Sequence, residues 1–282
     1  MTIQKVGVIG AGLMGNGITQ TCAAAGYSVI MVDMNDAALD KGLNMISGSL
    51  ERLIKKEKIT DSKKASILTH IQITTDYAKL SDCDFVIEAA TENLQVKIKI
   101  LQQIDKIVSP NAIIASNTSS ISISQMAAIV SRPERFIGMH FFNPVPMMAL
   151  VEIIRGLQTS DPTHALVHEM SLKLGKSPIS VKNSPGFVVN RILVPMINEA
   201  FFVLAEGIAT PEDIDNGMKL GCNHPIGPLA LADLVGLDTT LAVMEVYFEN
   251  FSDSKYRPCP LLREMVAAGY LGRKSGRGVY HY

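Results

Sequence analysis

A glycine-rich turn between two apolar runs constrains this chain more than any other feature. The first run, residues 5–9, leads directly into Gly-Ala-Gly-Leu-Met-Gly at residues 10–15. A helical stretch then reaches Gly26, and a second apolar run at 28–32 ends in Asp33. Strand, glycine turn, helix, strand and acid, in that order, predict a dinucleotide-binding βαβ unit.

Each glycine of the turn has a distinct expected task. Gly10 allows a tight turn, Gly12 lets the backbone approach a pyrophosphate, and Gly15 lets the helix pack closely, while the helix N-terminus offers N–H donors. Asp33 follows Gly15 by 18 residues, near the offset of about 20 at which an acid meets the adenosine ribose. Its carboxylate would repel a 2′-phosphate, which favours NAD(H). The expected cofactor loop is Gly10, Ala11, Gly12, Leu13, Met14 and Gly15.

Composition narrows the class of protein. With 282 residues, 47% hydrophobic and 19% charged, the chain can bury one large core or two moderate ones. A net charge of −1 gives no basic field for nucleic acid. The four cysteines are scattered, without metal-ligand spacing, so we expect no metal site and a reducing compartment. No apolar run reaches the roughly 18 residues of a membrane span, and the first strand begins too early for a signal peptide. A cytoplasmic location is expected.

A long helical excursion follows Asp33. Residues 36–58 carry apolar side chains at three- and four-residue steps, and a second short helix is expected at 61–68. The far end of the first helix is basic, with Lys56 among four cations. Two interpretations stay open: a solvated helix face, or a landing site for a phosphate-bearing substrate.

Polar segments follow the next two buried strands. The apolar run at 84–89 leads to residues 90–93, and Lys97 lies in the first turn of the helix after them, where a cation opposes the helix dipole. The apolar run at 112–115 ends in Ser-Asn-Thr-Ser-Ser at 116–120. Ligands bind at the carboxyl ends of such strands, so these segments either contact the cofactor or are simply turns and helix caps.

One histidine and one glutamate are expected to form a pair. His140 directly follows the strand expected at 135–139. Glu152 lies in the middle of the apolar run 150–154, which we expect to be a buried parallel strand. An isolated buried charge costs several kcal/mol, so Glu152 needs a partner. A His140–Glu152 pair would fix the imidazole tautomer and raise its basicity, as a general base requires.

The pattern changes after Ser184. Alternating strands and helices give way to continuous helix, including a stretch at 187–206 that is apolar on more than one face and must be buried. The predicted fold is α/β: a Rossmann-like doubly wound sheet with a helical excursion at residues 1–184, followed by a smaller all-α domain at 185–282.

Five segments together resemble one family. They are GAGLMG with Asp33, SNTSS, GMHFFNPVPMMALVEII, NSPGFVVNRIL and GRKSGRGVYHY. The chain is similar over essentially its whole length to the L-3-hydroxyacyl-CoA dehydrogenases, in the short form that carries no fused enoyl-CoA hydratase.

The resemblance implies an activity and a set of site residues. The implied activity is NAD(H)-dependent interconversion of (S)-3-hydroxyacyl-CoA and 3-ketoacyl-CoA, with 3-hydroxybutyryl-CoA and acetoacetyl-CoA as the expected pair. The family implies an active site in the cleft between the two domains, and a homodimer formed through the helical domain. By position, His140 is the base, Glu152 its orienting partner, and Ser119 and Asn190 bind the reacting oxygen and thioester. The implied cofactor residues are the glycine loop with Asp33, Glu92, Lys97, Ser119, Asn143 and Lys274, and the implied coenzyme A contacts are Ser49 and Lys56.

Two other functions stay open from the sequence. One is a dehydrogenase of a free hydroxy acid or sugar acid on the same fold, which would need no cationic landing site on the excursion. The other is a non-catalytic NAD(H)-binding protein, against which the intact set of His140, Glu152, Ser119 and Asn190 argues.

Overall fold

A single eight-stranded sheet forms the first part of the chain. The computed structural model describes residues 2–282. The strand order is β3-β2-β1-β4-β5-β6-β7-β8, and the pairs from β3 through β6 are parallel. The order reverses between β1 and β4, where a doubly wound sheet opens a crevice for ligands at its carboxyl edge. The strands are β1 Lys5–Ile9, β2 Ser28–Val32, β3 Ile71–Thr74, β4 Phe85–Glu88, β5 Ile113–Ser116, β6 Phe136–Phe141, β7 Leu150–Arg155 and β8 Ser177–Lys182.

The expectation of a parallel strand at 150–154 is wrong. β7 runs antiparallel to β6, and β8 is parallel to β7. A parallel connection needs a crossover of a dozen or more residues, and only residues 142–149 separate β6 from β7. The two strands therefore form a hairpin.

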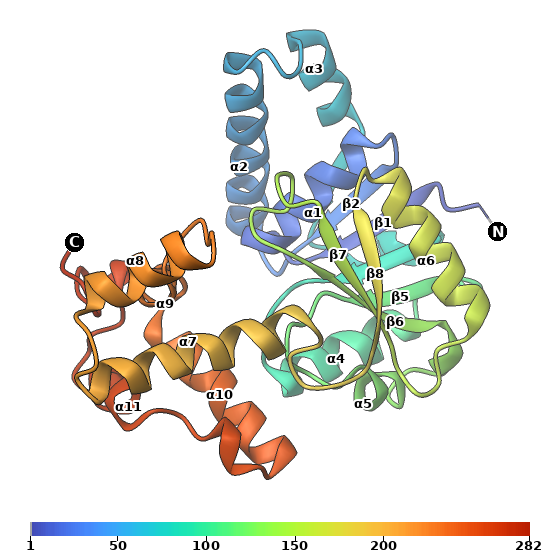
Figure 1. Ribbon diagram of the computed structural model, residues 1–282. Helices are drawn as coiled ribbons and strands as arrows, with labels where there is room; N and C mark the ends of the chain where they lie inside the picture. The colour runs from blue at the N-terminus through green and yellow to red at the C-terminus, as the bar shows by residue number, and fades with distance from the viewer. Residues whose placement is uncertain (1) are drawn as a thin grey trace. The chain divides into compact units, whose positions relative to one another are not determined.

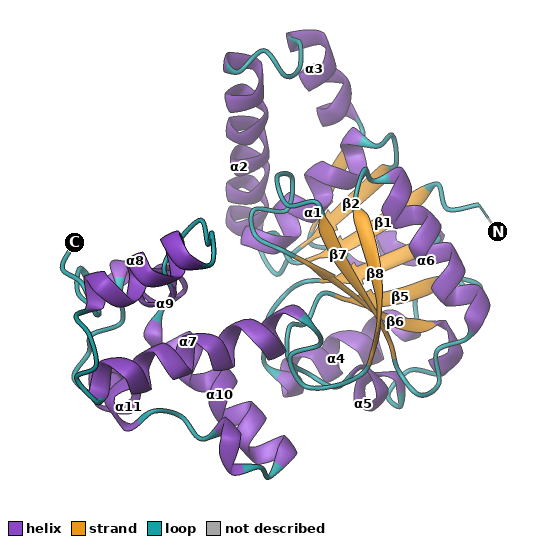
Figure 2. Cartoon of the chain, in the orientation of Figure 1, coloured by secondary structure: helices purple, strands orange, loops and turns teal. Residues whose placement is uncertain are grey.

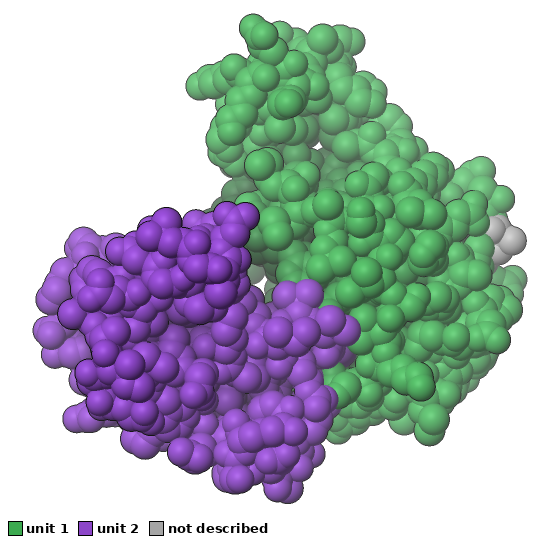
Figure 3. Space-filling model, viewed as in Figure 1, with its two compact units in different colours: residues 1–184 green, residues 185–282 purple. Residues whose placement is uncertain are grey.

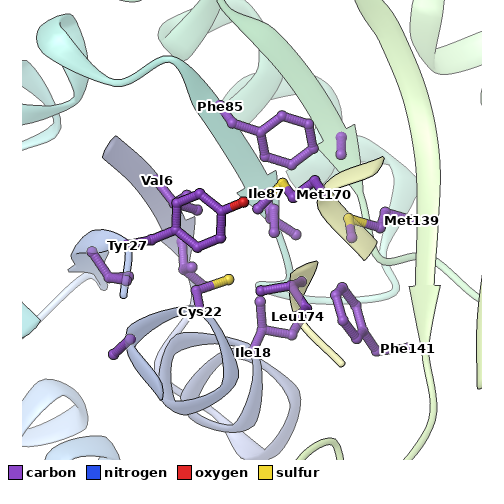
Figure 4. Close-up of a cluster of buried hydrophobic side chains, with 14 of the residues drawn as sticks. Val6, Ile18, Cys22, Tyr27, Phe85, Ile87, Met139, Phe141, Met170 and Leu174 are labelled. Carbon is purple, nitrogen blue, oxygen red and sulfur yellow. The ribbon is translucent and has the colours of Figure 1, made fainter. Parts of the chain in front are cut away.

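One face of the sheet carries the main core. Alternate strand residues, including Val6, Phe85, Ile87 and Met139, pack against the helices α1 and α6 (Figure 4). Cys22 lies in this core, and burial raises the pKa of its thiol to about 12. The helices of the first unit are α1 Leu13–Ala24, α2 Asp36–Lys55, α3 Asp61–Thr69, α4 Leu94–Asp105, α5 Ile123–Ala127 and α6 Asp161–Lys173.

The expected helical excursion is present. α2 and α3 form a helical hairpin that extends away from the sheet (Figure 1). Asn35 and Thr60 cap the two helices, each accepting a hydrogen bond from the backbone N–H three residues on. The fully buried residues of α2 lie between Leu39 and Leu50. Beyond them Leu53 still packs against the core, whereas Arg52 and Lys55 are exposed.

The chain divides into two compact units, residues 1–184 and 185–282 (Figure 3). All of the strands lie in the first, and the second is helical (Figure 2). Its helices are α7 Val189–Ala205, α8 Pro211–Gly221, α9 Pro228–Val235, α10 Leu237–Phe251 and α11 Pro260–Ala267. Within residues 2–282, no helix combines the length and apolar character that crossing a membrane requires.

The C-terminal tail is fixed to the second unit by two buried aspartates. Asp233 accepts hydrogen bonds from the backbone N–H groups of Val279 and Tyr280. Asp215 accepts from the hydroxyl of Tyr280 and from the first turn of α9. These bonds satisfy carboxylates that would otherwise be costly to bury.

Candidate active site at the carboxyl edge of the sheet

The glycine turn has the geometry of a phosphate-binding loop. Gly10 has a φ of 103°, a conformation that L side chains rarely adopt. A Cβ on Gly15 would collide with the carbonyl oxygen of Gly10, so the helix could not begin this close to β1 with any other residue. A Cβ on Gly12 would meet nothing within 4 Å, and no side chain caps α1. The helix N-terminus therefore faces open space, as binding a pyrophosphate requires.

Asp33 holds this turn as well as facing the site. Its Oδ2 accepts a hydrogen bond of 2.6 Å from the backbone N–H of Ala11, and its Oδ1 accepts one of 2.7 Å from Met34. The acid at the end of β2 thus fixes the loop at the end of β1. This second task was not expected from the sequence.

His140 and Glu152 face each other across the β6–β7 hairpin. They are direct partners in the antiparallel register, and Nδ1 of His140 lies 2.7 Å from Oε2 of Glu152. Glu152 is fully buried, and the imidazole is 8% exposed. Because an ionised carboxylate only accepts hydrogen bonds, this contact requires a proton on Nδ1, and in the neutral imidazole the lone pair is then on Nε2. The expected contact is therefore formed, through an antiparallel pairing instead of the expected parallel one.

A second buried ion pair lies on the same face of the sheet. Glu88 ends β4, and its Oε2 accepts a hydrogen bond of 2.5 Å from Nζ of Lys97 and one of 2.7 Å from the hydroxyl of Ser116. Glu88 is fully buried and Lys97 is 1% exposed. The cation that seemed to oppose the α4 dipole is thus neutralised by Glu88, with Glu92 a further 3.8 Å contact.

Glu92 organises the Ser-Asn-Thr-Ser-Ser segment. Its Oε1 accepts hydrogen bonds from the hydroxyls of Thr118, Ser119 and Ser120 and from the backbone N–H groups of Ser119 and Ser120. Burial alone would raise the pKa of Glu92, but Lys97 and these donors outweigh it and lower the pKa. The loop after β5 is therefore built around a charged carboxylate from the loop after β4.

A cavity of about 760 Å³ lies beside α1 and α2. Ser49 and Asn143, both expected site residues, line it, whereas Lys56 lies beyond it, exposed at the end of α2. Lys41 and Arg52 supply its cations. The cavity is also lined by Leu13, Asn16, Gly17, Gln20, Ala37, Asp40, Asn44, Met45, Gly48 and Pro144–Pro146.

The remaining expected residues belong to the second unit. Asn190 lies in the first turn of α7 and is half-buried. Nζ of Lys274 lies 2.6 Å and 2.7 Å from the two carboxylate oxygens of Asp238, on an exposed part of the unit. Their expected roles stay predictions.

Sequence reasoning assigned no role to Glu88, and it singled out Ser116 only as part of the segment at 116–120, without its contact to Glu88. The signal that singled out Glu152, one carboxylate within a buried apolar strand, is equally present at Glu88, which ends Phe-Val-Ile-Glu. Applied consistently, the rule that a buried carboxylate needs a partner would have predicted the Glu88–Lys97 pair.

Known families match both units. Residues 5–184 match the model of the 3-hydroxyacyl-CoA dehydrogenase NAD binding domain, and residues 186–282 match that of the 3-hydroxyacyl-CoA dehydrogenase C-terminal domain.

Similar proteins cover the whole chain. A probable 3-hydroxybutyryl-CoA dehydrogenase of Deinococcus radiodurans is 55% identical over 99% of this chain and 100% of its own length. The 3-hydroxybutyryl-CoA dehydrogenase of Bradyrhizobium diazoefficiens is 51% identical over 99% and 96%. The crystal structure of (S)-3-hydroxybutyryl-CoA dehydrogenase from Ralstonia eutropha is 68% identical, with a TM-score of 0.98 over 100% of this chain and 99% of that one.

Proposed function

The chain belongs to the 3-hydroxyacyl-CoA dehydrogenase family, and from this we propose that it interconverts (S)-3-hydroxyacyl-CoA and 3-ketoacyl-CoA with NAD(H), acting on 3-hydroxybutyryl-CoA and acetoacetyl-CoA. The observation that carries the proposal is the buried His140–Glu152 pair at the edge of a sheet whose glycine turn is built for a dinucleotide.

His140 acts as the general acid and base. In the oxidative direction its Nε2 removes the proton of the 3-hydroxyl group as the hydride leaves C3, and in the reductive direction the imidazolium returns a proton to the forming alkoxide. NAD(H), when bound, accepts or supplies that hydride. Glu152 stabilises the imidazolium and keeps Nε2 directed to the substrate. General acid–base assistance of this kind contributes on the order of 10²- to 10⁴-fold.

Two further residues bind the reacting group. Ser119 is held by Glu92 through its N–H and its hydroxyl. When substrate binds, the hydroxyl turns away from Glu92 and donates its single proton to the substrate oxygen, while the N–H keeps the loop in place. Asn190 binds the thioester. The preformed loop reduces the ordering that substrate binding would otherwise require.

The cofactor is held by backbone and carboxylates. The turn at residues 10–15 binds the pyrophosphate, Asp33 binds the adenosine ribose, and Glu92 lies at the same edge of the sheet. Lys97 acts through the carboxylates that it contacts, since it is almost fully buried. Asn143 and Lys274 complete the set.

The cavity beside α2 receives coenzyme A. Its Lys41 and Arg52 supply the positive charge that a phosphate-bearing substrate needs, with Ser49 between them on the same helix. Lys56, exposed at the end of α2, meets the outermost phosphate. A homodimer formed through residues 185–282 and a cytoplasmic location belong to the same proposal; the largely exposed Ile208 and Leu220 of the second unit offer apolar contact surface for a partner.

A comparison of two substrates tests the function. NADH oxidation is followed at 340 nm with acetoacetyl-CoA and with free acetoacetate, each at saturating NADH. We expect turnover of acetoacetyl-CoA and at least a 100-fold lower kcat/KM for the free acid, because only the thioester can use the cationic cavity.

Either alternative function has a clear signature in the same assay. Equal or better turnover of free acetoacetate would identify a dehydrogenase of free acids. Binding of NADH without turnover of any acyl-CoA, from four to sixteen carbons, would identify a non-catalytic protein.

A further inference from the structure

One polar side chain in the cavity has no protein partner. Gln20 lies on α1 and is only 3% exposed, and within residues 2–282 its carboxamide makes no hydrogen bond with the protein. Its polar atoms are not among the fully enclosed unpaired ones, so they reach the cavity that the residue lines. Almost all largely buried polar groups are hydrogen-bonded to protein or to water, so a carboxamide without a protein partner is hydrated through the cavity, and a polar group of a ligand can replace that water. A carboxamide buried at the wall of a cavity therefore points to a polar group that enters the cavity.

Two nearby polar side chains of α1 are already satisfied. Asn16, one turn earlier on the same cavity wall, donates to the carbonyl of Gly12 at 2.6 Å. The hydroxyl of Thr21, the next residue, donates to the carbonyl of Gly17 at 2.8 Å. The hydroxyl of Thr19 is also unpaired within the described residues, but Thr19 lines neither this cavity nor the one beside it. Among the polar side chains of α1 that line these cavities in the described part of the chain, Gln20 is the one left to a ligand.

The position of Gln20 indicates which part of a ligand it meets. The cavity that Gln20 lines is bounded by the cations Lys41 and Arg52 of α2 and by the segment Asn143–Pro146, which begins three residues after His140. Gln20 and Pro146 also line a second cavity of about 360 Å³, so the carboxamide lies where the two cavities meet. The group it meets lies between the reacting carbon and the phosphates of the substrate.

A carboxamide both donates and accepts hydrogen bonds, which is the complement of an amide. In an acyl-CoA, the part between thioester and phosphates is the pantetheine arm, which carries two amides. We propose that Gln20 is a specificity-determining residue that hydrogen-bonds an amide of the pantetheine arm. This proposal rests on the proposed function, because it assigns the cavity to the acyl-CoA.

The test varies the protein and the substrate together. Three thioesters of acetoacetate are compared: the coenzyme A ester, the pantetheine ester, which keeps both amides without the nucleotide, and the S-ethyl ester, which has no amide. Gln20→Leu keeps the shape of the side chain and removes its polar atoms. Thr21→Val is the matched control, since Thr21 lines only the smaller cavity and removing its hydroxyl perturbs the same helix.

Gln20→Leu is expected to lower kcat/KM for the coenzyme A and pantetheine esters by about 5- to 30-fold, the effect of one lost hydrogen bond to the ligand. For the S-ethyl ester we expect no change beyond twofold, and the Kd for NADH, read by fluorescence, should also stay within twofold. Thr21→Val should show no such difference between the esters.

Two results would overturn the inference. An equal loss for all three esters would mean that Gln20 is structural, and an unchanged kcat/KM for all three would mean that water satisfies its carboxamide. Failure of the proposed function is a separate result, since the wild-type protein would then turn over none of the thioesters.

Discussion

At the scale of single residues, the site contains four acidic side chains, and each has different hydrogen-bond partners. Asp33 accepts from the backbone of the glycine turn, Glu152 accepts from an imidazole, and Glu88 accepts from a lysine and a serine. Glu92 differs from these three because five donors from one loop converge on one of its oxygens. Its charge is what holds the loop that carries Ser119.

The lowered pKa of Glu92 predicts a pH dependence. A carboxyl whose pKa is lower in the folded than in the unfolded protein stabilises the fold above its unfolded value of 4.5, and this stabilisation is lost as the pH falls through the folded value. We expect Glu92→Gln to reduce the free energy of unfolding at pH 7 and to differ less from the wild type below pH 4.5. Urea unfolding at a series of pH values measures this.

The matched control is Glu249→Gln, at an exposed carboxylate of α10. If the difference between wild type and Glu92→Gln were the same at pH 7 and pH 4, the charge of Glu92 would not be what holds the loop.

At the scale of elements, local patterns predicted most of the architecture. The glycine turn, the buried strands and the amphipathic stretch of α2 each have a short-range signature, so they could be read from residue types and spacing. The direction of β7 could not, because an apolar run such as Leu150–Ile154 is compatible with either orientation. Only the short connection from β6, residues 142–149, carried that information.

Local sequence patterns also could not predict which groups pair with the buried polar side chains. Contacts such as Lys97 with Glu88, or Lys176 with the β6–β7 loop, join residues on different elements. The same holds for Gln20. That its carboxamide has no protein partner among the described residues follows from the assembled fold and cannot be read from the residues around it in the sequence.

Lys176 predicts how the β6–β7 hairpin loop is held. Its buried ammonium donates to the carbonyl of Val145 at 2.5 Å and to that of Met148 at 2.8 Å. On the other side, Val145 contacts α1, where a Cβ on Gly17 would come within 2.9 Å of its side chain. We expect Lys176→Met to free the loop and speed amide hydrogen exchange at Met147 and Met148, whose N–H groups bond to Pro144.

Lys173→Met is the matched control for this change. Lys173 ends α6, three residues before Lys176, is exposed, and lies over the ring of Tyr27 without contacting the loop carbonyls. Unchanged exchange at Met147 and Met148 in Lys176→Met would mean that the turn itself, rather than the lysine, holds the loop.

At the scale of the whole molecule, the expected site residues are divided between the two units. The first unit contains the glycine turn, the His140–Glu152 pair and the 760 Å³ cavity. The second has its own core around Ile197, Phe201 and Leu229, and supplies Asn190 and Lys274. Only the first unit contains a proton-transfer pair of this kind in the described residues, so the central chemical claim concerns His140.

The most direct test of that claim is turnover by His140→Gln. Steady-state reduction of acetoacetyl-CoA is measured for this variant and the wild type, with NADH binding followed by fluorescence in the same preparations. The variant keeps a hydrogen-bonding side chain opposite Glu152 but cannot exchange a proton. We predict a 10²- to 10⁴-fold fall in kcat with an unchanged Kd for NADH. A kcat within tenfold of the wild type would contradict the assignment of His140 as the general acid and base.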